Sequence, residues 1–213
     1  MLEQDRSVCQ HEWMFTSLDD LAGPGPLPEQ DARTRVLECA YRLFYRHGLR
    51  ATGIDRIIAE SGVAKASFYR HFPTKQALVE AYLDLRHARW MGWLESRLAA
   101  APDARAWLAA LPDALDDWFR APGFRGCAFI NGHAEAGTDA PPMTVTHKRE
   151  LAARIEAACR EADFVRPDEV AADLLLLIEG AIVRAQMEGA DAARAPLARA
   201  FARVLAGAER AHV

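Results

Sequence analysis

Hydrogen-bond donors crowd the short segment from Lys65 to His71. Five of its seven residues carry a donor on the side chain, namely Lys65, Ser67, Tyr69, Arg70 and His71. Long donors on a short exposed helix suit the major groove of DNA, where contacts to phosphates fix position and contacts to base edges give sequence preference. Phe68 and Phe72, four residues apart, would bury the opposite face. The pattern predicts either a DNA-reading helix or an ordinary helical hairpin with a polar outer side.

The neighbouring residues predict the elements that position this segment. Apolar residues at helical spacing indicate a first helix over 31–47. Thr52 or Gly53 is expected to start a short second helix, and Thr52 would be a good cap because its hydroxyl can accept a backbone N–H. The turn 61–63, which contains Gly62, joins this helix to the donor-rich one, and two short helices joined in this way are typical of a helix-turn-helix. Thr74 is expected to cap a long fourth helix.

Charge is distributed unevenly along the chain. Residues 31–90 hold 11 Lys/Arg and 6 Asp/Glu, a net charge of +5, whereas the rest of the chain carries −9. A basic block on an acidic remainder indicates that one part of the molecule meets a polyanion. Chance clustering of basic residues is the alternative interpretation.

Composition favours an all-helical fold. Alanine, the best helix former and a poor strand former, accounts for 42 of the 213 residues. We predict a three-helix head on a body of about six helices, with Pro112 disturbing one body helix and Pro196 in the first turn of the last. Residues 1–30, which end in a Gly/Pro run, are expected to form a flexible arm, 31–76 the helix-turn-helix domain and 77–213 the body.

Several classes of protein are disfavoured. No apolar run is long enough to span a membrane, and the first residues lack the order of a signal peptide. The four cysteines form no CxxC pair. We therefore expect a soluble, cytoplasmic protein that has no metal or cofactor and does not bind a membrane.

The segment from Thr34 to Leu83 resembles the N-terminal DNA-binding domain of the TetR family of transcriptional regulators. About fifty residues match without a gap. The matching positions, in family order, are Phe44, Gly48, Thr52, Ile58, Ala59, Gly62, Val63, Ser67, Tyr69, His71, Phe72 and Lys75.

The resemblance implies a role for each of these positions that could reach DNA. Thr52, Tyr69, His71 and Lys75 would hold phosphates, and Lys75 would act beside the positive end of the fourth helix. Lys65, Ala66 and Ser67 would face base edges, and Arg70 would reach either a base or a phosphate. Lys65 is the best candidate for reading a guanine, because its ammonium can serve O6 and N7.

The resemblance also implies that the body dimerises and senses a ligand. The last two helices would pair across a two-fold axis through apolar faces, or pack only within the subunit. The candidate interface residues are Leu174, Ile178, Ala181, Ala185, Phe201, Val204 and Leu205. The candidate pocket residues, which are otherwise core or surface residues, are Trp93, Trp107, Trp118, Phe119, Phe129, His133, Met143 and His147.

Two polar features of the body have competing interpretations. His133, Glu135, Asp139 and His147 lie close in sequence but lack metal-ligand spacing, so surface or pocket roles are favoured over a metal site. Cys127 lies at a predicted helix N-terminus near Arg125, a setting that lowers the pKa of a thiol. It is either a redox sensor or an inert buried thiol.

Taken together, the resemblance implies a homodimeric regulator. We expect a repressor that binds a palindromic operator in double-stranded DNA and is released by a small apolar or aromatic effector. One alternative is a TetR-like DNA binder controlled by a protein partner or by thiol oxidation. Another is an all-helical enzyme, for which the sequence offers no nucleophile–base arrangement.

Overall fold

The computed structural model describes residues 18, 21, 23, 25 and 28–208, and within these residues it contains helices and no strand. The all-helical prediction is confirmed over this part of the chain. Most of the predicted N-terminal arm lies outside the described residues. Leu21, which is described, is buried, and its carbonyl oxygen accepts hydrogen bonds from Arg86 and Tyr41. None of the described helices is long and apolar enough to cross a membrane.

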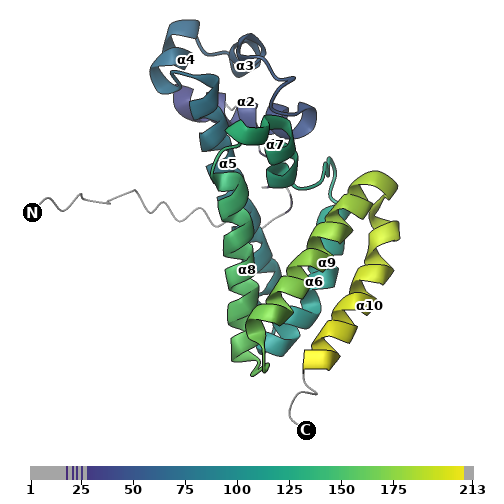
Figure 1. The fold of residues 1–213 in the computed structure, drawn as a ribbon. Coiled ribbons are helices and arrows are strands. Elements are labelled where there is room, and N and C mark those ends of the chain that lie inside the picture. The colour runs from purple at the N-terminus through teal and green to yellow at the C-terminus, as the bar shows by residue number, and fades with distance from the viewer. Residues whose placement is uncertain (1–17, 19–20, 22, 24, 26–27, 209–213) are drawn as a thin grey trace, which may run out of the picture.

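Helices α2, α3 and α4 form a small head at one end of the molecule (Figure 1). Their bounds are α2 Ala32–His47, α3 Ile54–Ser61 and α4 Lys65–His71. Val36, Ile57 and Phe68 are fully buried between these helices, so each contributes one apolar face to a shared core. Asp31 caps α2 by accepting the N–H of Thr34 at 3.0 Å.

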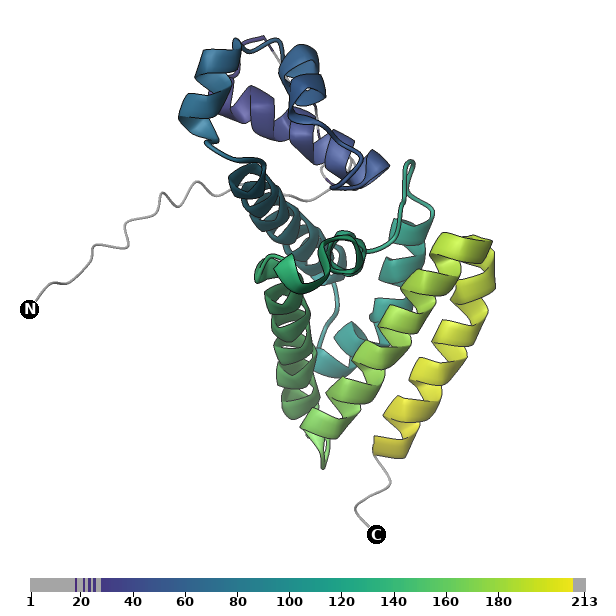
Figure 2. The ribbon, with the colours of Figure 1, turned by 45° about the horizontal axis from the view of Figure 1, so that its top comes forward.

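Helix α5 connects the head to the body. It spans Lys75–Leu98, and Thr74 caps it as predicted, since its Oγ1 accepts the N–H of Ala77 at 3.0 Å. Leu78 near its start and Trp93 near its end are both buried. The helix therefore lies in the core over most of its length and leads from the head deep into the body (Figure 2).

The body contains the remaining helices. Their bounds are α6 Ala104–Phe119, α7 Ala128–Ala136, the 3₁₀ turn η1 Gly137–Asp139, α8 Met143–Glu161, α9 Pro167–Glu188 and α10 Ala190–Ala208. The long helices α6, α8, α9 and α10 pack side by side, with α9 between α8 and α10. The short helix α7 lies across the gap between the head and this bundle (Figure 2).

Of the two predictions about prolines, the one about Pro196 is wrong. Pro112 lies inside α6, and the disturbance expected there does not end the helix. Helix α10 begins at Ala190, six residues before Pro196, so this proline is inside the helix and not in its first turn. In both cases burial of the apolar helix face against its neighbours outweighs the hydrogen bond that proline cannot donate.

Candidate nucleic-acid interface and head–body cavities

The turn between α3 and α4 is held rigidly against α2. Gly62 ends α3 with φ of +62°, a left-handed conformation that favours glycine. The guanidinium of Arg35 donates to the carbonyl oxygens of Ser61 at 2.7 Å and Gly62 at 2.8 Å. These bonds satisfy carbonyls at the end of α3 and fix the angle at which α4 leaves the turn.

Helix α4 presents its predicted donors to solvent. Phe68 and Phe72 are buried beneath it, while Lys65, Tyr69 and Arg70 are exposed and Ser67 and His71 are partly buried. The head therefore places the predicted base-reading and phosphate-holding side chains of α4 on one outer surface. The exposed Ala66 has only a methyl group to offer.

The contacts of these donors are weak and local. Lys65 Nζ lies 3.4 Å from the exposed carboxylate of Asp55, and Arg70 donates to Ser67 Oγ at 3.0 Å. Lys75 Nζ lies 3.5 Å from the carbonyl oxygen of Arg50. Exposed contacts of this kind contribute little stability, so these side chains can exchange them for contacts to a polyanion.

Thr52 differs from its predicted role. Gly53, and not Thr52, is the N-cap of α3. The Thr52 side chain is fully buried, and its hydroxyl donates toward the carbonyl oxygens of Gly48 at 2.8 Å and Leu43 at 3.3 Å. The hydroxyl therefore ties the end of α2 to the start of α3 and is not placed to hold a phosphate.

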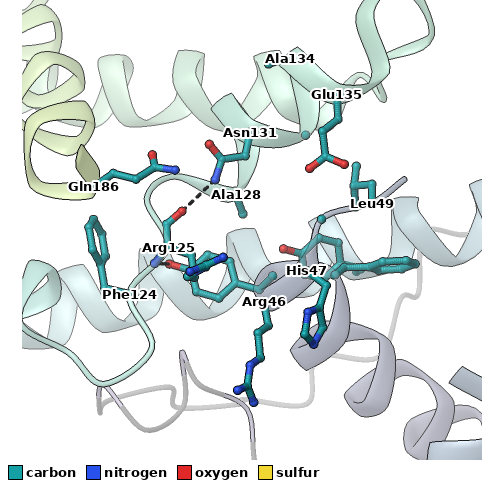
Figure 3. A pocket seen from close by; sticks show the side chains of 15 residues that line it. Arg46, His47, Leu49, Phe124, Arg125, Ala128, Asn131, Ala134, Glu135 and Gln186 are labelled. Carbon is teal, nitrogen blue, oxygen red and sulfur yellow. Dashed lines mark hydrogen bonds between the residues drawn. The ribbon is translucent and has the colours of Figure 1, made fainter. Parts of the chain in front are cut away.

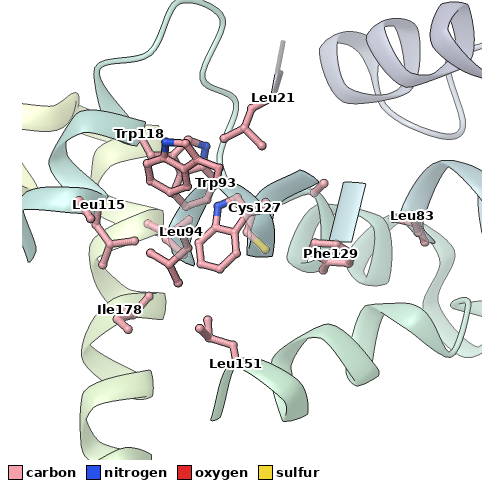
Figure 4. Packing of buried hydrophobic residues seen from close by; sticks show 14 of the residues in the cluster. Leu21, Leu83, Trp93, Leu94, Leu115, Trp118, Cys127, Phe129, Leu151 and Ile178 are labelled. Carbon is pink, nitrogen blue, oxygen red and sulfur yellow. The ribbon is translucent and has the colours of Figure 1, made fainter. Parts of the chain in front are cut away.

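The predicted ligand-pocket residues lie mainly in a closed core. Trp118, Phe129 and His147 line a void of only about 10 Å³, together with Trp90 and Arg86. Such a void has room for about one water molecule. Trp93, Trp107 and Phe119 are buried elsewhere in the cluster, part of which is drawn in Figure 4. Most of the predicted pocket residues are therefore core residues, the alternative interpretation, and of them Trp118 also lines a larger cavity.

His147 is the centre of this closed core. Its ring stacks on Phe129 with centroids 3.7 Å apart, and its Nδ1 lies 3.0 Å from Nδ1 of His87. Burial lowers the pKa of His147 to about 2, with a smaller contribution from the positive charge of Lys148. The imidazole is therefore neutral at physiological pH.

The larger cavities lie at the junction of head and body. One, of about 520 Å³, separates the end of α2 from α7 and contains Arg125, Glu135 and Asn131 in its lining (Figure 3). A second, of about 440 Å³, opens beside it and shares Tyr45 and Arg125. Sequence reasoning did not predict this site, because its residues come from segments about eighty positions apart. The sequence signal that could have indicated it is the pair Arg42 and Arg46, which lie four residues apart and therefore on the same face of α2.

Hydrogen bonds join the head to α7 and to the segment before it, beside these cavities. The Tyr45 hydroxyl donates to the carbonyl oxygen of Gly126 at 2.9 Å and accepts the N–H of Arg125 at 3.0 Å. Glu135 on α7 accepts the backbone N–H of Arg50 at 2.9 Å. The position of the head is thus coupled to the segment that lines both cavities.

The other predicted polar features do not gather into a site. The exposed His133 lies 3.1 Å from Thr144 Oγ1, Met143 is partly buried, and His147 is in the core. No group of three or more His, Cys, Asp or Glu residues suited to a metal ion occurs in the described part of the chain. Cys127 is the N-cap of α7 and is buried, whereas reactive thiols are at least partly exposed.

Most predicted dimer residues face the interior of their own chain. Five of the seven are buried there, namely Leu174, Ile178, Ala181, Ala185 and Phe201. They pack within the subunit, which is the alternative interpretation, and little of their surface is left for a partner. Val204 and Leu205 are partly buried.

Comparisons with known proteins agree with this architecture. The family model described as "Bacterial regulatory proteins, tetR family" matches residues 36–82. The transcriptional regulator LmrA of Bacillus subtilis is 41% identical over 58 residues, which are 26% of this chain and 31% of that protein. The transcriptional repressor KstR2 of Rhodococcus jostii is 33% identical over 93 residues, 44% of this chain and 43% of that protein. The chain thus aligns with about a third of the first of these relatives and under half of the second.

Solved structures extend the likeness to most of the chain. A TetR-family transcriptional regulator from Streptomyces coelicolor is 29% identical with a TM-score of 0.79, over 85% of this chain and 91% of that one. A putative TetR regulator from Streptomyces avermitilis is 26% identical with a TM-score of 0.76, over 84% of this chain and 99% of that one. The head matches the family by sequence and the whole described fold matches it by shape. The head, residues 36–82, thus belongs to the TetR family of bacterial regulatory proteins, and the whole described fold is similar to that of TetR-family regulators.

Proposed function

We propose that this chain is a homodimeric transcriptional repressor that binds a palindromic operator and is released by a small effector. The observation that carries the proposal is the exposed row of donors on α4, held on a rigid turn in the segment that matches the family model. Residues 31–76 would form the DNA-binding domain and 77–213 the sensing and dimerising domain.

On DNA, the residues of α4 would divide into those that contact base edges and those that contact phosphates. Lys65, Ala66 and Ser67 open the helix and would face base edges, because recognition helices read bases with their N-terminal residues. Tyr69 and His71 would hold phosphates, and Arg70 would reach either a base or a phosphate. Lys75 at the start of α5 would hold a phosphate beside the positive end of that helix. Thr52 is left out of this set because its side chain is buried.

A second copy of the chain would cover an apolar stripe on α9. Leu176, Val183 and Met187 are exposed and fall on one face, with Gly180 between them. Small exposed residues follow the neighbouring helix α10 at similar spacing: Ala195, Ala198, Ala202 and Ala206. Apolar residues flanked by small ones allow two helix pairs to pack closely, and a two-fold dimer matches the two half-sites of a palindrome.

Effector control would act through the junction of head and body. The contacts of Tyr45 and Glu135 tie the head to α7 and the segment before it; Tyr45 lines both larger cavities and Glu135 lines the first. An effector that prefers one arrangement of this junction shifts the population of head positions, and operator affinity shifts with it.

The test is selection of bound sequences from a random duplex library with the full chain, followed by titration of the selected DNA. We expect a palindrome with half-sites about one helical turn apart. Tyr69→Ala combined with Lys75→Ala should lose most of the affinity, while Arg149→Gln, an exposed change on α8, should keep it. Failure to enrich any sequence, or full affinity in the double variant, would contradict the proposal.

A further inference from the structure

Four arginines line the cavity of about 440 Å³ at the junction of head and body. We call this cavity the arginine cleft; its cationic residues are Arg42, Arg46, Arg86 and Arg125, and no Asp or Glu is among the described residues that line it. Arg42 and Arg46 come from α2 in the head, Arg86 from α5 and Arg125 from the segment before α7. The chain thus gathers positive charge here from three separate segments.

These arginines are not neutralised within the described part of the chain. Arg42, Arg46 and Arg125 are exposed, and within residues 28–208 none of them forms an ion pair. Guanidinium groups in this state can each offer a planar pair of donors to an incoming anion.

Arg86 gives the strongest indication that the arginine cleft binds an anion. Its side chain is 99% buried, and Nη1 donates to two neutral acceptors, the carbonyl oxygen of Leu21 at 2.6 Å and the Tyr41 hydroxyl at 2.8 Å. Its Nη2 is buried and has no hydrogen-bond partner among the described residues. The nearby Glu38 is already paired with Arg89. The guanidinium lies 4.0 Å from the centroid of the Tyr45 ring, and this cation–π contact offsets part of the cost of burying the charge. No carboxylate in the described part of the chain pairs with Arg86, so an anion at this arginine would be favoured.

The rest of the lining is largely apolar and aromatic. Tyr45, Trp118 and Phe124 form one wall, with the rings of Trp118 and Phe124 in edge contact at 5.1 Å between centroids. Leu21, which also lines the cleft, is drawn with Trp118 in Figure 4. Aromatic walls select flat apolar groups through ring contacts and burial of apolar surface.

We propose that the arginine cleft binds a small organic carboxylate with an aromatic body, and that this class of molecule is the effector. The carboxylate would lie among the four guanidinium groups and the ring against Tyr45, Trp118 and Phe124. A carboxylate fits better than a phosphate, because a compact, strongly hydrated anion would leave the aromatic wall uncovered.

The position of the cleft gives such a ligand a regulatory effect, and this part of the inference rests on the proposed function. Arg42 and Arg46 move with the DNA-binding head, whereas Arg86 and Arg125 belong to the body. One anion bound to both sets favours the head position in which they converge. A ligand changes an equilibrium only by binding its two states differently, and a bridging anion does so.

The test measures binding to the full chain by calorimetry without DNA. Benzoate, cinnamate and indole-3-acetate are compared with their neutral amides. We expect the carboxylates to bind at least tenfold more tightly than the amides, because a charge-assisted bond to arginine is lost in the amide. Equal binding of acids and amides, or no binding of any acid, overturns the proposal.

Variants place the binding in the cleft. Arg125→Gln should weaken carboxylate binding at least tenfold and change amide binding less than twofold. Arg125 is exposed, so the fold should be kept, and thermal unfolding checks this. Arg149→Gln on α8 is the matched control and should bind like the parent chain. Equal loss in both variants would show a general charge effect and overturn the site.

The chain's own acidic residues provide the competing occupant. Asp19 and Asp20 lie in sequence between Leu18 and Leu21, which line the cleft, but are themselves outside the described residues. If the parent chain binds no carboxylate and Asp19→Asn/Asp20→Asn does, the chain fills its own cleft and the proposal fails.

Operator titration separates this inference from the proposed function. Binding of carboxylates that is lost in Arg125→Gln, without any effect on DNA affinity, would keep the site and overturn its role as the effector site. Strong operator binding by a chain that binds no carboxylate would overturn the cleft alone.

Discussion

His147 shows how one buried side chain sets the acid sensitivity of the body. It is 98% buried, stacked on Phe129, and surrounded by Lys148, His87 and Arg86. Protonating it in place would bury a charge among like charges, which is why its pKa lies near 2. Glu150 contacts Nε2 of His87 at 3.0 Å, on the opposite side of the ring from His147, so His87 lies between this carboxylate and His147.

The free energy of unfolding should therefore fall as the solution is acidified below pH 6.5. In that range the unfolded chain binds a proton at His147 and the folded chain does not, down to about pH 2. Stability from this residue is fully present above pH 6.5 and decreases by about 1.4 kcal/mol per pH unit below it. Between pH 7 and pH 5 the loss is about 2 kcal/mol.

Urea unfolding at several pH values measures this effect. His147→Phe keeps an aromatic ring against Phe129 and removes the titrating group, so its stability should depend less on pH. His133→Phe, at an exposed histidine, should retain the parent's pH dependence. Identical dependence of stability on pH in the parent chain and in His147→Phe would show that this pH dependence does not come from His147.

Lys65 and Lys75 should differ in how they contribute to operator binding. Lys65→Ala should cost about 1–3 kcal/mol and relax preference at one base position, because a base-edge contact is lost. Lys75→Ala should weaken binding to all sequences alike and lower the salt dependence by about one released ion, because a phosphate contact is lost. Fluorescence anisotropy with single-base operator variants at several salt concentrations separates the two, and identical behaviour would contradict the division.

At the scale of elements, two glycines at the junction of α2 and α3 differ in whether their backbone and surroundings would accept a side chain. Gly48 ends α2 with φ of +90°, and a Cβ there would lie 2.8 Å from Oε1 of Glu135. Gly53 has φ of −82°, and a Cβ there would meet nothing within 4 Å.

Gly48→Ala should lower the free energy of unfolding by about 1–3 kcal/mol, because it adds backbone strain and displaces Glu135 from Arg50. Gly53→Ala should be neutral or stabilise by up to about 1 kcal/mol, because it restricts the unfolded chain at an unstrained position. Denaturant unfolding of the two variants measures both effects. A loss of stability in Gly53→Ala as large as that in Gly48→Ala would contradict this reading of the junction.

The same elements show what local sequence can predict. Gly62 in its left-handed turn and Thr74 as a cap were predictable, because each depends on neighbours a few positions away. The prediction that Thr52 caps α3 was wrong, because its hydroxyl donates to carbonyl oxygens at the end of α2 and does not accept a backbone N–H at the start of α3. The arginine cleft was not predictable, since Arg42 and Arg125 come together only through the packing of the head on the body.

At the scale of the whole molecule, periodicity alone does not distinguish the apolar residues of α9 that pack within the subunit from those that remain exposed. Leu174 and Ile178 lie on the same helix as Leu176, and all three are apolar. The structure separates them, because Leu174 and Ile178 are buried within the subunit while Leu176 remains 70% exposed. Which apolar face of α9 is left for a partner depends on how the neighbouring helices pack.

This exposed face leads to the prediction for the assembly. Leu176 and Met187, 70% and 78% exposed, lie three turns apart along α9. Burial of such side chains contributes about 1.5–3 kcal/mol each, and a two-fold interface contains every residue twice. Leu176→Asp combined with Met187→Asp therefore removes four apolar contacts and places like charges across the interface. The variant should be monomeric at micromolar concentration in light scattering, while the parent chain is a dimer.

Val145→Asp is the matched control for this experiment. Val145 is also an exposed apolar residue, at 39%, but it lies on α8, away from the stripe. It should remain a dimer and keep its affinity for the full palindrome. The α9 variant should lose most of that affinity while keeping its helical circular dichroism, because a single head contacts only half of the operator's phosphates and bases. A monomeric parent chain, or a dimeric double variant, would contradict the assignment of this face to a second copy.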